Sequence, residues 1–316
     1  MIKSILKGLA TYTPLYRSVG GGRTGGTNSA RYCYSVWFRH LLHAVEKGGM
    51  DPVPEVIAEL GPGDSLGTGL AGLLSGAREY HAFDIVTFSN PARNLELFGE
   101  LIDLFRNREP IPGEDEFPNV APKLGSYIFP SEILPDSLLE RTLEPSRLEA
   151  VREQIATTGA AENDFGIRVQ YTVPWDEGQI RSDSVDFLFS QAVLEHVRDL
   201  DRTCAAINRW LVPGGFCSHT IDLRSHNLVR SWDGHWAIPP FWWRLIYGRR
   251  EYLLNRLPVS SHEQAHEMHG LEIRYALRRT MEPVITPEKL ASSHRWLSDE
   301  DRQTAGVYLL ARKRNT

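Results

Sequence analysis

Short apolar runs alternate along the chain with segments in which apolar residues recur every three or four positions. Runs of the first kind predict buried strands, and segments of the second kind predict amphipathic helices. Strands that alternate with helices predict an α/β fold, a Rossmann-like, mostly parallel sheet with helices on both faces. The seven predicted strands are 55–60, 79–86, 167–173, 184–193, 214–223, 271–279 and 305–314, and the main predicted helices are 31–49, 65–75, 194–211 and 262–270.

Two segments depart from this alternation. Residues 1–50 form an N-terminal arm and a helix, and the glycine-rich stretch 20–30 is either a flexible arm or a lid that orders over a ligand. Residues 88–165 are rich in proline but keep apolar residues throughout, which predicts an inserted helical cap subdomain. We therefore expect one main domain over residues 51–316 that contains this insertion.

The composition is that of an ordinary soluble globular protein, with 41% hydrophobic and 24% charged residues in a chain of 316. A net charge of −5 without a basic stripe speaks against nucleic acid as a partner. Cys33, Cys204 and Cys217 are too far apart for a disulfide framework or a Cys-x-x-Cys metal site. These cysteines and the absence of a long apolar run predict a cytoplasmic protein without stable membrane insertion.

A glycine-rich turn follows the first predicted strand, in VIAELGPGDSLGTGLAGLL, residues 56–74. Ligands of open parallel sheets bind at the carboxyl ends of the strands, where this turn lies. The turn lacks the lysine of a phosphate-binding loop, and its glycine spacing is one residue too long for the dinucleotide motif. Glu59 adds a carboxylate, and Asp84 ends the next strand, where an acid can accept ribose hydroxyls. A nucleoside with positive charge, such as S-adenosylmethionine, fits this pocket.

Two sequence blocks surround Asp84 in a consistent order. ELGPGDSLG, residues 59–67, resembles the motif E/D-x-G-x-G-x-x-x-G, and residues 185–223, VDFLFSQAVLEH through VPGGFCSHTIDL, resemble a fourth strand, its helix and a fifth strand. The chain is thus similar to class I S-adenosylmethionine-dependent methyltransferases. It also looks like the methyltransferase-domain proteins of bacterial glycan and secondary-metabolite pathways.

The resemblance implies roles for individual residues. Gly61 and Gly63 would lie under the methionine part of the cofactor, Glu59 near its amino group, and Asp84 on the ribose. Segment 174–176 would contact adenine, and the end of the fourth strand would face the transferable methyl. The implied cofactor-binding residues are Glu59, Leu60, Gly61, Pro62, Gly63, Asp84, Ile85, Pro174, Trp175, Asp176, Ser190 and Gln191.

A hydroxyl acceptor needs a general base at the same strand ends. The candidates there are Glu195, His196, His219, Asp222 and His226. We expect His226 or Asp222 to be the base, because both lie where the fifth strand ends, with His196 as the third catalytic residue.

No metal is predicted at these residues. Ubiquinone-pathway O-methyltransferases resemble the segment around His196 and hold a divalent metal there, but their additional glutamate corresponds to Ala192. HEQAH, residues 262–266, matches the zinc-protease motif H-E-x-x-H. Ser261 and Gln264 form a capping-box pattern that would place His262 in the first turn of a helix, so a peptidase is not expected.

The predicted function is methylation of a hydroxyl group on a small molecule, a sugar or a lipid-linked glycan, with S-adenosylmethionine as the cofactor. Residues 237–256 are aromatic and basic, and they form either a packed lid, an acceptor pocket or a membrane contact. The alternatives are methylation of nitrogen or carbon, and a methyltransferase fold that only binds the cofactor.

Overall fold

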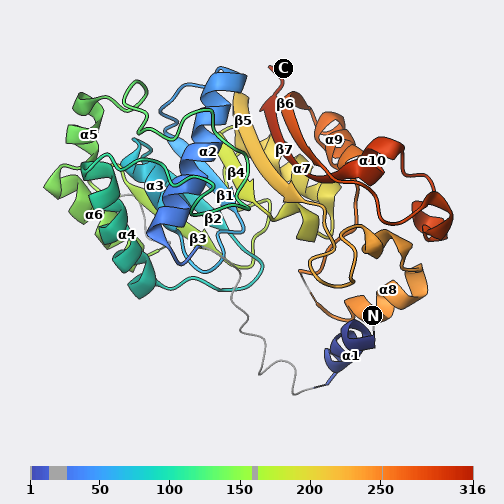
Figure 1. Ribbon diagram of the computed structural model, residues 1–316. Coiled ribbons are helices and arrows are strands. Elements are labelled where there is room, and N and C mark those ends of the chain that lie inside the picture. Colours follow the sequence, from blue (N-terminus) through green and yellow to red (C-terminus); the bar gives the residue numbers. More distant parts are fainter. Residues whose placement is uncertain (1, 14–26, 159–162, 251, 316) are drawn as a thin grey trace.

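A seven-stranded sheet runs through the centre of the computed structural model, which describes residues 2–13, 27–158, 163–250 and 252–315 (Figure 1). Its strand order is β3-β2-β1-β4-β5-β7-β6. The first five strands pair in parallel, and β7 is antiparallel to both of its neighbours. The predicted Rossmann-like, mostly parallel sheet is therefore confirmed. The strands are β1 (Val56–Leu60), β2 (Glu79–Phe83), β3 (Arg168–Thr172), β4 (Val185–Gln191), β5 (Leu211–Asp222), β6 (Leu271–Thr280) and β7 (Thr304–Lys313).

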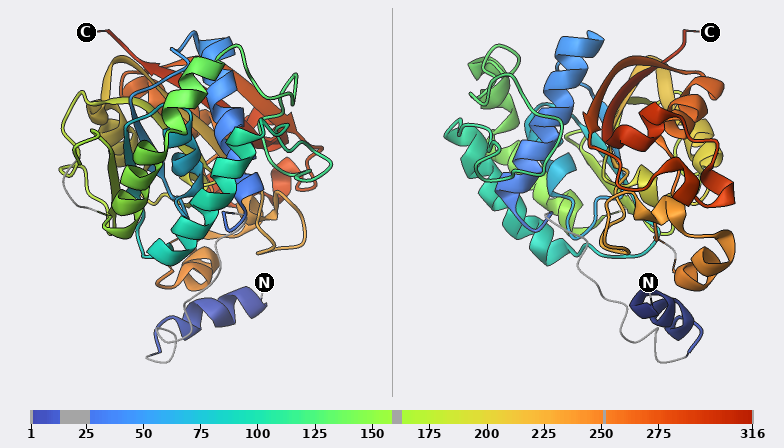
Figure 2. Two further views of the ribbon diagram at one scale, coloured as in Figure 1. Left: turned by 90° about the vertical axis from the view of Figure 1, so that its left-hand side faces the viewer. Right: turned by 45° about the vertical axis from the view of Figure 1, so that its right-hand side comes forward.

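Helices cover both faces of this sheet (Figure 2). Alternate residues of β1 point to opposite faces, so Ile57 joins the core under one set of helices while Ala58 joins the core under the other. The first face carries α2 (Ala30–Gly48), α3 (Gly67–Leu74), α4 (Pro91–Arg106), α5 (Asp136–Thr142) and α6 (Pro145–Ala156), and the second carries α7 (Leu200–Trp210) and α9 (Val259–Met268). The remaining helices are α1 (Ile2–Ala10), α8 (Pro240–Tyr247) and α10 (Asp299–Gln303).

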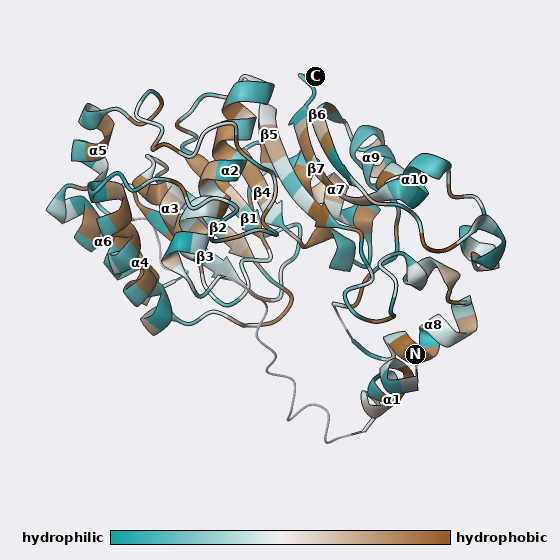
Figure 3. Cartoon of the chain, viewed as in Figure 1, coloured by the Kyte–Doolittle hydropathy of each residue, from teal (hydrophilic) through white to brown (hydrophobic). Residues whose placement is uncertain are grey.

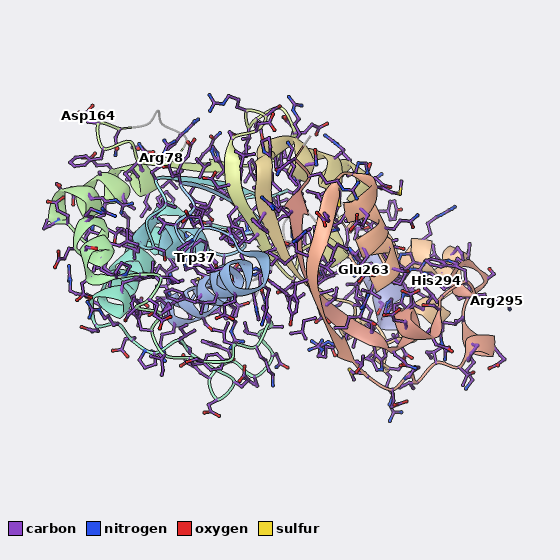
Figure 4. All side chains as sticks on the ribbon, turned by 90° about the horizontal axis from the view of Figure 1, so that it is seen from above. Trp37, Arg78, Asp164, Glu263, His294 and Arg295 are labelled. Atoms are coloured by element: carbon purple, nitrogen blue, oxygen red, sulfur yellow. The ribbon has the colours of Figure 1, made fainter. Side chains whose placement is uncertain are left out.

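Helix α2 is the central helix of the first face. It begins where the Ser29 side chain accepts a hydrogen bond from the Tyr32 amide, and it ends at Gly49 with φ 71°, close to the predicted limits. Trp37 points from it to the sheet (Figure 4), with its ring 5.5 Å from that of Phe189. This packing fixes α2 across the strands that carry the candidate site.

The insertion at 88–165 shares the core of the first face. The brown, hydrophobic sides of α4 and α6 turn toward α2 and α3 (Figure 3), and buried residues such as Phe98 and Val151 belong to the same apolar cluster. A loop of this insertion crosses to the strand ends, where the Ala121 carbonyl accepts hydrogen bonds from Gln191 and Thr220 at 3.3 and 3.2 Å. The insertion thus contributes both a helical layer and one wall of the candidate site.

The N-terminal segment contacts two parts of the molecule. Helix α1 packs on α8, away from the sheet (Figure 1). Residues 20–26 of the glycine-rich stretch lie outside the described residues. Immediately after them, the Thr27 hydroxyl accepts a hydrogen bond from the Asp64 amide at 2.9 Å, and the Asn28 side chain donates to Asp64 at 3.2 Å. The described part of the chain contains no helix long and apolar enough to cross a membrane.

The predicted helix 194–211 differs from the structure at its start. A short 3-10 turn at Leu194–His196 comes first, and α7 begins after Asp199, whose side chain accepts a hydrogen bond from the Arg202 amide. This N-cap ends the preceding turn and starts the helix. As a result, His196 lies in this short turn after β4 and not in α7.

Candidate active site

The glycine turn connects β1 to α3 at the carboxyl edge of the sheet. Gly61 and Gly63 have φ values of 66° and 73°, which side chains other than glycine rarely adopt. A Cβ on Gly61 would lie 2.6 Å from Val193 Cγ2. The turn therefore requires glycine for its own conformation and for its contact with the end of β4. Leu60 and Pro62 of the same turn are buried.

Asp84 directly follows β2 and lies beside this turn, since the Gly61 amide donates a 2.8 Å hydrogen bond to the carbonyl of Phe83. Asp84 is only 7% exposed. Its Oδ1 accepts from the Ile85 amide at 2.8 Å, whereas its buried Oδ2 has no partner in the described part of the chain. Burial raises the pKa of Asp84 to about 6, against the opposing effect of the Ile85 and Gly63 backbone N–H groups. A carboxylate oxygen is thus left to accept a ligand's hydroxyl.

Glu59 is 3% exposed, and its carboxyl group is directed toward α3. The Tyr80 hydroxyl donates a hydrogen bond to Glu59 Oε2. Burial raises the pKa of Glu59 to about 8, while hydrogen bonds from Tyr80 and from Gly69 and Thr68 of α3 counteract it. The carboxyl group therefore joins β1, β2 and α3 beneath the glycine turn. Its contact with a cofactor amino group stays a prediction.

The segment predicted to contact adenine lies next to Asp84, because the Trp175 amide donates to the Asp84 carbonyl at 3.1 Å. The Trp175 ring packs at 5.8 Å from the ring of Trp210 on α7. Pro174 and Asp176 are exposed, and Asp176 Oδ1 accepts from the Gly178 amide in a local turn. Stacking of these residues on adenine remains a prediction. Ile85 presents an apolar surface, 36% exposed, beside Asp84.

Ser190 and Gln191 end β4 and point to opposite faces of the sheet. Ser190 is fully buried, with its Oγ 2.7 Å from His219 Nδ1 on the α7 side. Gln191 Oε1 lies 3.0 Å from Nε2 of His40, a buried residue of α2. The two side chains cannot both face one methyl group, which corrects our expectation for Ser190. Sequence analysis missed His40, although a histidine on the apolar side of a predicted helix was a signal for a buried polar contact.

Asp222 lies at the end of β5 and is tied to positively charged groups. Arg224 donates to both of its carboxylate oxygens at 2.8 and 2.7 Å, and Arg279 Nη2 lies 3.5 Å from Oδ1. Burial alone would raise the pKa of Asp222, but hydrogen bonds from Arg224 and His226 outweigh it and hold that pKa well below its usual range. Asp222 is therefore a weak base. It is placed to orient His226, whose Nε2 is 3.5 Å from Oδ2.

The predicted catalytic residues His196 and His226 come together here, with their ring centres 5.1 Å apart. Ligand atoms of Glu195, His196 and His226 all lie within 4.8 Å of one another, so they could hold a divalent cation. Glu195 Oε2 and His196 Nδ1 are buried without a hydrogen-bond partner in the described residues. Burial raises the pKa of Glu195 to about 8 and lowers that of His196 to about 4. Both groups are therefore mainly neutral at pH 7, and the absence of a metal stays a prediction.

His219 lies in the core and not with the other candidate bases. It is fully buried and faces α9, where the ring of His266 is 5.3 Å away. The predicted capping box at Ser261 is wrong, because α9 begins at Val259 with Pro258 as its N-cap residue. His262 is consequently the fourth residue of the helix, at the end of its first turn, and is fully buried. The HEQAH motif therefore has no accessible metal position of the kind a peptidase needs.

Comparison with known proteins adds a family match. Residues 143–218 match the family described as "Methyltransferase domain". No curated protein matches the chain.

Several solved structures are similar to the chain at low sequence identity. An S-adenosylmethionine-dependent methyltransferase from Methanosarcina mazei is 12% identical, with a TM-score of 0.42 and coverage of 84% of this chain and 94% of that one. A putative sarcosine dimethylglycine methyltransferase from Galdieria sulphuraria is 14% identical, with a TM-score of 0.43 and coverage of 87% and 84%. Phosphoethanolamine N-methyltransferase 2 from Haemonchus contortus, in complex with S-adenosyl-L-methionine, is 16% identical, with a TM-score of 0.41 and coverage of 92% and 58%.

The family match includes β4 with Gln191, the short turn that carries His196, α7 and most of β5. The resemblance to methyltransferases is confirmed, whereas the bacterial glycan type stays a prediction. Both the match and the sheet support S-adenosylmethionine as the cofactor. Residues 143–218 of the chain match the methyltransferase domain family, and the sheet that contains them has a Rossmann-like strand order.

Proposed function

We propose that the protein transfers a methyl group from S-adenosylmethionine to a hydroxyl group of a small molecule, such as a sugar or a lipid-linked glycan. The observation that carries the proposal is Asp84 Oδ2, a buried carboxylate oxygen without a partner in the described residues, next to the glycine turn. Two neighbouring ribose hydroxyls would satisfy this carboxylate, and the exposed side chain of Ile85 would contact the adenine ring. An ammonium group beside the turn would lower the pKa of Glu59 and favour its charged form.

The catalytic step needs alignment and one proton acceptor. S-adenosylmethionine, when bound, supplies a methyl group activated by its positive sulfur. In our proposal the ends of β4 and β5 hold the acceptor in line with that methyl. His226 takes the hydroxyl proton, and the Asp222 carboxylate orients the imidazole and stabilises the imidazolium that forms. The Asp222–His226 pair supports oxygen as the acceptor atom, since an uncharged amine would need no such base.

The surroundings of α8 support a sugar-sized acceptor. A surface pocket of about 340 Å³ lies near the end of β4 and is lined by Arg198, Trp243, Tyr247 and Asn255, among others. The Asn255 amide donates to the Glu195 carbonyl at 2.7 Å, which connects the pocket wall to the catalytic turn. Aromatic rings beside hydrogen-bonding groups suit a carbohydrate with an apolar face.

The test is calorimetric titration with S-adenosylhomocysteine, without added metal, of the wild type and of Asp84→Asn. We expect micromolar binding to the wild type. The variant should bind tenfold to a hundredfold more weakly, since a hydrogen bond to a charged group contributes about 1.5–3 kcal/mol. Asp164→Asn removes an exposed carboxylate elsewhere and is the control. Equal affinity of all three proteins would show that Asp84 does not bind the ribose.

A further inference from the structure

A second group of metal-binding side chains lies inside the protein, between β5 and α9. Cys217 and His219 are two residues apart and therefore lie on the same face of β5. His262 and His266 project from successive turns of α9. All four side chains are fully buried. The methyl-transfer site proposed above uses none of them, and the two histidines of α9 belong to the HEQAH motif, which the sequence analysis left without a function.

The ring orientations resemble those of metal-bound histidines. His266 Nδ1 is 2.7 Å from the His262 carbonyl oxygen, which can only accept, so this nitrogen carries the proton. The unprotonated His266 Nε2 is buried and has no hydrogen-bond partner in the described residues. His219 Nδ1 lies 2.7 Å from Ser190 Oγ, a hydroxyl oxygen that is able to accept a hydrogen bond from a proton-bearing Nδ1, and its Nε2 is buried without a partner among the described residues. A histidine that binds a metal through one nitrogen usually donates from the other.

We propose that Cys217, His219 and His266 bind a zinc ion. One ligand atom of each side chain lies within 4.8 Å of the others. Bonds of about 2.0–2.3 Å to a tetrahedral zinc ion would bring these atoms somewhat closer together. One thiolate and imidazole nitrogens are the donors that zinc prefers.

His262 is the candidate for the fourth ligand. Both of its ring nitrogens are buried without a partner in the described residues, and it lies one helical turn before His266. The lone pairs of these imidazoles would otherwise face one another in an apolar core, which costs free energy.

A site of this kind is closed and stabilises the fold. All of its ligands are inaccessible to solvent, so no position is left for a substrate. Glu263, the acidic residue of the HEQAH motif, is half-buried and pairs with Arg278 of β6. The ion would fix α9 to β5, and chelation should therefore lower the thermal midpoint of unfolding.

Cobalt(II) absorption tests the site on the whole protein. Protein purified without an affinity tag is freed of metal and titrated with cobalt(II) alone. We expect one equivalent to give the visible bands of a tetrahedral ion and a sulfur-to-cobalt charge-transfer band, and one equivalent of zinc to abolish both. Elemental analysis after gel filtration of zinc-treated protein should find one zinc per chain.

Variants identify the ligands. Cys217→Ser should lose the charge-transfer band, whereas Cys33→Ser, which alters a buried cysteine of α2, should keep it. His196→Ala should also keep the band, which separates this site from the carboxylate-containing cluster near His226. Wild-type protein that shows neither cobalt bands nor bound zinc would overturn the proposal, whatever the folding of the variants. A charge-transfer band that persists in Cys217→Ser would overturn it as well.

Discussion

The position of Asp84 in the fold could be predicted from sequence, whereas the side chains that surround the site could not. Its position after the second strand follows from local pattern, and the structure places it beside the glycine turn as expected. The hydrogen-bond partners of other residues in the site could not be placed in this way. Glu59 is held by Tyr80, 21 residues away, and Gln191 by His40, 151 residues away. Such pairs depend on how the elements pack, and one sequence does not reveal them.

Asp84 predicts a pH dependence of cofactor binding. Burial raises its pKa to about 6, so the free protein takes up a proton there as the pH falls. A protonated carboxyl group accepts ribose hydroxyls less well, and we expect affinity for S-adenosylhomocysteine to be constant above about pH 7 and to decline below about pH 6. Calorimetric titrations across this range measure it. An Asp84→Asn variant should show no such decline from this group, and a wild-type affinity independent of pH would contradict the prediction.

The role of His226 as the general base is tested by measuring turnover and cofactor binding separately. His226→Ala should lower kcat about 100-fold or more, within the range that a positioned base contributes. Affinity for S-adenosylhomocysteine should stay unchanged, because the residue contacts the acceptor side. Asp222→Asn should lower kcat less, since it removes the orienting group and leaves the imidazole. Full activity of His226→Ala would exclude it as the base and would favour nitrogen as the acceptor atom.

The bounds of helices and strands were predictable from sequence where neighbouring residues determine them. The prediction was wrong where a contact with a distant residue determines where a helix begins. The αL glycine at the end of α2 and the apolar runs of the central strands are local signals. The start of α9 is a counterexample, because Asp301 Oδ1 accepts a hydrogen bond from the Ser260 amide and helps to fix the first turn. The Ser261 pattern that predicted a later start could not include this contact from α10.

The close packing of helix α3 on Tyr80 predicts the effect of substituting one of its glycines. A Cβ on Gly69 would lie 2.0–2.4 Å from atoms of the Tyr80 ring, which is fully buried. Gly69→Ala should therefore destabilise the fold by about 1–3 kcal/mol through overpacking, and should weaken cofactor binding by displacing Tyr80 from Glu59. Urea denaturation and titration with S-adenosylhomocysteine measure the two effects.

Gly99 is the matched control in α4. A Cβ there would meet nothing within 4 Å. Gly99→Ala should stabilise the protein by roughly 0.5–1 kcal/mol, because alanine favours the helix. If both substitutions changed stability in the same direction and by the same amount, the close packing of α3 on Tyr80 would be refuted.

At the scale of the whole molecule, two buried carboxyl groups set a pH dependence of stability. Burial raises the pKa values of Glu59 and Glu195 to about 8. Between their ordinary pKa and this value the folded state holds protons that the unfolded state releases, so the contribution of these two groups to the free energy of unfolding falls as pH rises from about 4.5 to 8. Glu59→Gln should make this decline shallower in urea denaturation, whereas the exposed Glu132→Gln should leave it unchanged. A decline of the same slope in Glu59→Gln would contradict the assignment.

The architecture was predictable because the alternation of strands and helices runs through most of the chain. The role of the insertion was harder to foresee, since its helices share the core of the first face and its Ala121 carbonyl reaches the ends of β4 and β5. The buried Cys217–His219–His266 cluster was also beyond sequence analysis. Its members lie about fifty residues apart, and only the packing of α9 on β5 brings them together.

The position of β7 has a consequence for synthesis on the ribosome. This strand lies between β5 and β6 and supplies all of the hydrogen bonds that join β6 to the sheet. Until residues 304–313 have left the exit tunnel, β5 is an open edge and β6 has no partner strand. A nascent chain that already contains the glycine turn, Asp84 and His226 therefore still exposes a sheet edge that can pair with other chains. We expect the final strand to complete folding in a late, cooperative step, and chains that stop before it to depend on chaperones.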